Sequence, residues 1–173
     1  AHYLAVTRGG WRSLINDPQV RLFLLLVVVL IVLLSWYLTY SGQAFGNAFR
    51  QSSFNAVSIL TGTGYVSANY SAWGGFASTI LLMAMFIGGC GGSTTCGIKV
   101  FRLQVLAATV RVQINRLLRP HAVVLAYYNR RPVAPEVMDS IMGFFYLYIL
   151  GFVLIATLLG IIGLDFITAL SGA

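Results

Sequence analysis

Three long runs of this sequence carry no charged residue: residues 22–40, 74–98 and 141–162. At 1.5 Å per residue, a helix over the shortest run is about 28 Å long, close to the thickness of the hydrocarbon core of a bilayer. Asn16 or Asp17 can cap the first of these helices, with Pro18 in its first turn. The chain is 58% hydrophobic and only 9% charged, whereas soluble domains carry about 25% charged residues. Because so few charges cannot cover a water-facing surface, the sequence predicts an all-α integral membrane protein.

The basic residues lie in two blocks that flank the uncharged runs. The net charge is +7, and ten of the eleven lysines and arginines fall within residues 8–21 and 99–131. Basic residues beside membrane spans favour the cytoplasmic side. We therefore expect both blocks to be cytoplasmic and residues 41–73 to face the opposite side. Such charges suit the surface of anionic membrane lipid, and because they flank spans we expect no nucleic-acid partner.

The two cysteines form no metal or redox motif. Cys90 and Cys96 lie six residues apart in an apolar stretch, which is neither a CxxC pair nor a zinc-ligand spacing. We expect them to be small buried side chains that need not form a disulfide. We also expect no cofactor bound to this chain.

Residues 44–60 are too polar for a span that faces lipid. Glutamine, asparagine, serine and arginine interrupt the apolar residues there. The part from Phe49 to Leu60 would form a helix of about 18 Å, roughly half the thickness of a bilayer. Irregular backbone at the end of such a helix is tolerated at membrane depth only when it is buried in protein or lines a water-filled cavity. The pattern predicts a re-entrant pore helix over 44–60, after a span over 22–40.

The sequence TGTGY follows this half-helix directly. Backbone carbonyls can replace the hydration shell of a potassium ion, and they converge on one axis only where the backbone adopts dihedral angles that glycine tolerates. The pattern predicts an ion filter with carbonyl ligands from residues 61–64 and with the tyrosine packed behind it. The predicted filter residues are Thr61, Gly62, Thr63, Gly64 and Tyr65. An ordinary glycine–threonine turn between two spans is the alternative.

A cluster of glycines breaks the second uncharged run, so we expect the span over 74–118 to be interrupted. Glycine inside a helix costs up to about 1 kcal/mol relative to alanine, and five glycines lie within residues 88–97. The predicted loop, with the lysine that follows it, comprises Gly88, Gly89, Gly91, Gly92, Ser93, Thr94, Thr95, Gly97 and Lys99. Either the loop gates an ion path, or its small residues serve close helix packing. Lys99 is either a cation that faces that path or an anchor that reaches the membrane surface.

Three stretches resemble the Trk/Ktr/HKT superfamily of potassium transporters, and within it most closely the bacterial TrkH-like uptake subunits. They are SSFNAVSILTGTGYVSANY at 52–70, GGCGGSTTCGIKVFR at 88–102 and NDPQVR at 16–21. The resemblance implies a potassium-channel-like unit of span, pore helix, filter and span, repeated four times along one chain in a pseudo-tetrameric pore. This chain would then cover the third unit and part of the fourth. Gly64 is the residue that best matches the glycine such filters keep in each unit.

The resemblance also implies how the chain is divided. Residues 1–20 would be a cytoplasmic lead-in, 21–118 a complete pore domain, 119–135 a cytoplasmic connection, and 136–173 the first span and partial pore helix of the next domain. The filter of that next domain is absent from this sequence.

The function that the resemblance implies is potassium translocation across a bacterial inner membrane, with no catalysis. The implied partners are the remaining pore domains of the same chain, a second copy in a homodimer, and a cytoplasmic ring of subunits that bind NAD(H) or ATP. That ring would dock on the basic surface from Arg102 to Arg131, although positive charge beside anionic lipid explains the same residues. Two other functions stay open: an ion-coupled secondary transporter with broken helices at its ion site, and a structural subunit of a membrane complex.

Overall fold

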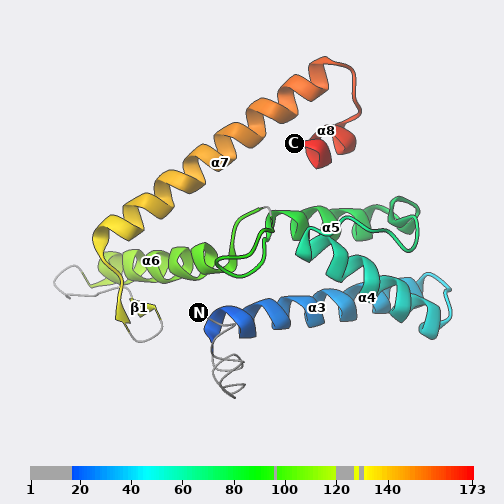
Figure 1. Cartoon of the computed structure of the whole chain (residues 1–173), viewed down its shortest axis with the longest axis horizontal. Coiled ribbons are helices and arrows are strands. Elements are labelled where there is room, and N and C mark those ends of the chain that lie inside the picture. The colour runs from blue at the N-terminus through cyan, green and yellow to red at the C-terminus, as the bar shows by residue number, and fades with distance from the viewer. Residues whose placement is uncertain (1–16, 96, 120–126, 129–130) are drawn as a thin grey trace. The chain divides into compact units, whose positions relative to one another are not determined.

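The computed structural model describes residues 17–95, 97–119, 127–128 and 131–173, which are predominantly α-helical (Figure 1). The chain divides into two compact units, Ala1–Leu103 and Gln104–Ala173. In the first unit lie α3 (Pro18–Tyr40), α4 (Phe45–Thr61), the short 3₁₀ helix η1 (Tyr70–Trp73), α5 (Gly75–Phe86) and the beginning of α6 (Val100–Leu118). In the second lie the rest of α6, β1 (Tyr127–Tyr128), β2 (Arg131–Pro132), α7 (Pro135–Ile161) and α8 (Phe166–Gly172). The helical class expected from the sequence is confirmed.

Among the described residues, two helices are long and apolar enough to cross a membrane, namely α3 and the part of α7 from Glu136 to Ile161. α3 starts where the sequence predicted, because the Asp17 carboxylate accepts the Gln19 N–H at 2.8 Å and Pro18 occupies the first turn. The second uncharged run does not form one helix, since α5 ends at Phe86 and α6 begins at Val100. The helical structure is therefore interrupted between Phe86 and Val100, where the glycines cluster.

α4 returns from the end of α3 and lies between α3 and α5 (Figure 1). One stripe of α4 consists of the small residues Ala48, Ser52 and Ala56, which are all 0% exposed. Small side chains allow two helices to approach closely. Ser52 contacts α3 directly, since its hydroxyl oxygen lies 2.5 Å from that of Ser35. The apolar core of the unit surrounds this contact and includes Leu34, Leu38, Leu60, Trp73 and Leu81.

The second unit contains two short strands that the sequence did not indicate. β1 and β2 pair antiparallel inside the expected connection 119–135, with Tyr127 opposite Pro132 and Tyr128 opposite Arg131. Residues 120–126 and 129–130 of that connection, and the predicted lead-in up to residue 16, lie outside the described residues. α8 contacts α7, and Asp165 at the N-cap position of α8 accepts a hydrogen bond from the Thr168 hydroxyl at 2.9 Å.

The small-residue stripe of α4 leads to a prediction about stability. Replacing Ala56 by leucine should destabilise the first unit by about 1–3 kcal/mol, because extra methyl groups forced into a packed core displace their neighbours. The measurement is the midpoint of thermal unfolding in detergent. Val32→Leu is the control, since Val32 lies on α3 and is 58% exposed. Equal midpoints for the two variants would contradict close packing at Ala56.

Candidate functional site

The glycine segment begins with the end of α4. α4 runs through Thr61, one residue further than predicted, and Gly62 closes it in a left-handed conformation with φ of 67°. The Gly62 N–H donates to the Ile59 carbonyl at 3.1 Å and the Thr63 N–H donates to the Ser58 carbonyl at 2.9 Å. This pattern of bonds is the one that usually ends helices at glycine. The non-helical part of the predicted filter therefore starts at Gly62, and residues 63–69 continue it without regular structure.

The threonine hydroxyls of this segment bond to each other and to α4. The Thr61 hydroxyl donates to the Val57 carbonyl at 2.7 Å, and it lies 2.6 Å from the Thr63 hydroxyl. Gly64 has a φ of 79°, and a Cβ placed on it would meet no atom within 4 Å. The need for glycine at this position is therefore one of backbone conformation and not of space within this chain.

Two buried polar side chains of α4 hold the segment from behind. Asn55, which is 1% exposed, donates to the Ser67 hydroxyl at 3.1 Å and accepts the Ser67 N–H at 3.2 Å. Ser58 donates its hydroxyl hydrogen to the Tyr65 carbonyl at 2.6 Å. Because these bonds come from inside the core, they fix the path of residues 65–67 relative to α4. The Tyr65 carbonyl points at Ser58 and not away from the helix.

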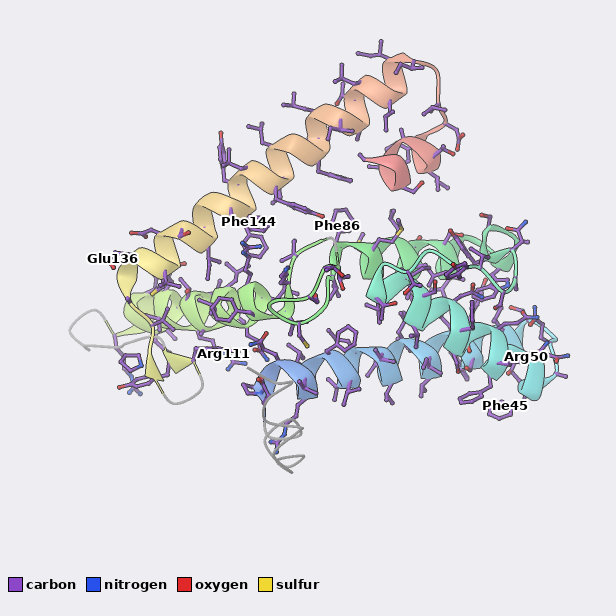
Figure 2. All side chains as sticks on the ribbon, in the orientation of Figure 1. Phe45, Arg50, Phe86, Arg111, Glu136 and Phe144 are labelled. Atoms are coloured by element: carbon purple, nitrogen blue, oxygen red, sulfur yellow. The ribbon has the colours of Figure 1, made fainter. Side chains whose placement is uncertain are left out.

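The Tyr65 side chain is exposed. It is 73% exposed and lines an apolar groove of about 640 Å³ along α4, together with Phe49, Phe54, Val57 and Thr63. Arg50 also lines this groove, near the start of α4 (Figure 2). The predicted packing of the tyrosine behind the filter thus involves no buried contact among the residues that the structure describes.

The loop between α5 and α6 closes on itself. The Gly88 N–H donates to the Ile98 carbonyl at 2.8 Å, and the Ile98 N–H donates to the Phe86 carbonyl at 2.8 Å. A third bond, from the Val100 N–H to the Gly89 carbonyl at 3.2 Å, joins the start of α6 to the loop. Phe86 marks the point where the chain leaves α5 (Figure 2). Residues 88–97 therefore form a loop whose two ends lie side by side.

Glycines in this loop are required by close approach of neighbouring atoms. Gly97 has a φ of 92°, and a Cβ there would lie 3.0 Å from the Phe86 carbonyl oxygen. A Cβ on Gly89 would lie 2.9 Å from the hydroxyl oxygens of both Ser93 and Thr95. Of the other predicted loop residues, Gly88 is buried whereas Gly91, Gly92 and Thr94 are exposed.

The lysine and the cysteines of the loop region have definite places. Lys99 is half-buried, and its ammonium group donates to the Ser93 carbonyl at 2.7 Å. It therefore braces the loop from inside, an arrangement that neither interpretation of Lys99 from the sequence included. Cys90 is a free thiol, and Cys96 lies outside the described residues.

Residues 7–172 match the family model of the cation transport protein TrkH. The chain belongs to the TrkH family. It is 38% identical over 172 residues to the Trk system potassium uptake protein TrkI of Halomonas elongata, covering 99% of this chain and 35% of that protein. It is 33% identical over 168 residues to the Trk system potassium uptake protein TrkG of Escherichia coli, covering 96% of this chain and 35% of that protein. The chain thus spans about a third of the length of these relatives.

The fold is also that of a solved member of the TrkH family. The crystal structure of the potassium transporter TrkH from Vibrio parahaemolyticus matches with a TM-score of 0.88 and 32% sequence identity. The match covers 98% of this chain and 37% of that one. A channel-like helical fold is therefore shared over nearly the whole of this chain.

The sequence alone did not assign a role to the α4 side chains that bind residues 65–67. Ser52, Asn55 and Ser58 follow each other at three-residue spacing, which places them on one side of a helix. The sequence showed that this half-helix is polar, but not that its polar side faces inward. Because Asn55 and Ser58 are buried, their side chains face the segment that follows α4 and form hydrogen bonds with it.

The geometry of the loop predicts that two of its glycines differ in their tolerance of alanine. Gly97 and Gly92 have φ of 92° and 88°, so alanine is strained at both, by about 1–2 kcal/mol. Only at Gly97 does the added methyl group also meet backbone atoms, whereas at Gly92 it meets nothing within 4 Å. Gly97→Ala should therefore unfold at a lower temperature than Gly92→Ala in detergent. Identical unfolding temperatures would show that the closed base of the loop is not formed as described.

Proposed function

We propose that residues 21–118 form one complete pore domain of a membrane protein that translocates potassium, with residues 61–65 as its ion filter. The relatives support the choice of ion, since TrkI and TrkG are both named as potassium uptake proteins. The observation that carries the proposal is the end of α4. α4, a 17-residue helix that contains polar residues, is followed by two glycines of positive φ, and its own buried side chains bind the backbone that follows.

The carbonyl groups of residues 61–64 are the proposed ligands of the ion. The last carbonyls of a helix have no intrahelical partner and carry partial negative charge, so the end of α4 favours a cation beside it. Carbonyls from four such repeats would together replace the hydration shell of potassium. Because the Tyr65 carbonyl is directed at Ser58, the proposed ligand set ends at Gly64.

The loop from Gly88 to Gly97, with Lys99, is the proposed gate. Its support is the closed base, where three backbone hydrogen bonds join the end of α5 to the start of α6. A loop closed in this way can move as one body while the helices on either side stay intact. α6 begins directly after Lys99, so a partner that pulls on α6 would act on the loop.

The rest of the proposed assembly follows the family resemblance. α7 and α8 would be the first span and the start of the pore helix of the next domain, joined to the first by a cytoplasmic connection. The proposed partners are the remaining pore domains of the same chain, a second copy in a homodimer, and a cytoplasmic nucleotide-binding ring. The proposed location is the inner membrane of a bacterium.

Ion-coupled transport is the second candidate function, favoured by the broken helix between α5 and α6. Secondary transporters place their ions at breaks of this kind. Uptake that follows an imposed sodium or proton gradient with fixed stoichiometry would favour coupled transport. Single-channel currents would favour the pore.

Gly64 provides the test of the filter. Gly64→Ala and Gly64→Ser should weaken discrimination of potassium from sodium, because a side chain is strained at a φ of 79° and the carbonyls must shift to relieve that strain. The measurement is competition between cations for uptake by the full protein. Gly46→Ala is the matched control, since Gly46 lies within α4 with open space around it. Unchanged selectivity in both Gly64 variants would refute the filter assignment.

Shortening the loop provides the test of the gate. Deleting Gly91 to Thr95 removes the Ser93 carbonyl that Lys99 binds, but it leaves the bonds that join Gly88, Ile98 and Phe86. The deletion should therefore keep α5 and α6 joined while it opens the ion path. Potassium flux into reconstituted vesicles should rise. A variant that folds, binds potassium and conducts no faster than the parent would mean that the loop is not a gate.

A further inference from the structure

The tip of the loop is bound to a helix far away in the sequence. The Gly91 N–H donates to the side-chain oxygen of Gln19 at 2.8 Å, across 72 residues. Gln19 lies in the first turn of α3, where its own N–H donates to the Asp17 carboxylate at 2.8 Å. The approach is close, since a Cβ on Gly91 would lie 3.0 Å from the same Gln19 oxygen. The capped first turn of α3 therefore holds the acceptor at a defined place beside the loop.

Two residues after Gly91, Ser93 joins the same loop to Lys99, the residue that precedes α6. The Lys99 ammonium group holds the Ser93 carbonyl at 2.7 Å. The Lys99 carbonyl accepts hydrogen bonds from the N–H groups of Arg102 at 2.9 Å and Leu103 at 3.3 Å. Both residues belong to the first turn of α6. The loop is thus connected to α3 through Gln19 and to α6 through Lys99.

We propose that Gln19 is a positioning residue that latches the loop in its closed position. The proposal rests on the assignment of the loop as a gate. A displacement of α6 away from α3 draws Ser93 with it through Lys99. The Gln19–Gly91 hydrogen bond joins the loop tip to α3, so it then has to break. Gln19 therefore sets how readily the loop opens, although it lies on a helix that does not itself form the loop.

The test has a readout that does not depend on ion transport. Cys90 precedes Gly91 and carries a free, half-buried thiol, so its rate of labelling by a maleimide reports opening of the loop tip. The full protein is prepared with Cys90 as its sole cysteine, in three variants: Gln19→Ala, Gln19→Glu and Gln113→Ala. Gln19→Glu keeps an oxygen acceptor on a side chain of the same length. Gln113→Ala is the matched control, because Gln113 is an exposed glutamine of α6. Potassium flux is measured on the same preparations.

Gln19→Ala should raise the labelling rate of Cys90 and the potassium flux by about two- to tenfold, the effect expected for loss of one ordinary hydrogen bond. Gln19→Glu and Gln113→Ala should behave as the parent does. Labelling of Gln19→Ala at the parent rate would overturn the latch. Faster labelling without faster flux, while deletion of Gly91 to Thr95 does raise flux, would also overturn it. If labelling is faster and neither change raises flux, the contact stands and the gate assignment fails.

Discussion

Every backbone N–H and C=O at membrane depth needs a hydrogen-bond partner, and the architecture of this TrkH-family chain depends on that constraint. A continuous helix meets the constraint by itself, but residues 63–69 and the loop between α5 and α6 are not helical. In residues 63–69, the Tyr65 carbonyl and the Ser67 N–H find partners in Ser58 and Asn55, which are buried side chains of α4. The loop after α5 finds them in its own two ends and in the side chains of Gln19 and Lys99. Residues 63–69 are thus held by side chains of α4, and the loop is held by Gln19 of α3 and by Lys99.

The two segments use glycine for different physical reasons. At Gly64 the surrounding space is open and only the positive φ calls for glycine. At Gly97 a positive φ is combined with a backbone carbonyl oxygen that a Cβ would approach to 3.0 Å, and at Gly89 a Cβ would lie 2.9 Å from two side-chain hydroxyl oxygens. A proposed filter needs an unusual backbone that points carbonyls in one direction. A proposed gate needs a compact loop that packs tightly when closed.

α3 contributes more to this arrangement than a membrane span alone would. Its middle part packs against the small-residue stripe of α4 through Ser35, and its first turn reaches the loop through Gln19. α4 and the loop that follows α5 therefore both form hydrogen bonds with α3. The Ser35–Ser52 contact is buried, whereas the hydrogen bond between Gln19 and Gly91 is exposed.

Local properties of the sequence were enough to predict α3, α7 and the break between α5 and α6. Uncharged runs predicted α3 and α7, Asp17 and Pro18 predicted the start of α3, and five clustered glycines predicted the break between α5 and α6. These predictions succeed because helix propensity and capping act over a few residues. The tertiary structure alone decided that Asn55 bonds to Ser67, that Lys99 turns inward to Ser93, and that Gln19 meets Gly91. A polar side chain is compatible with many partners, and only the packing of α3, α4 and α5 determines which backbone group lies within its reach.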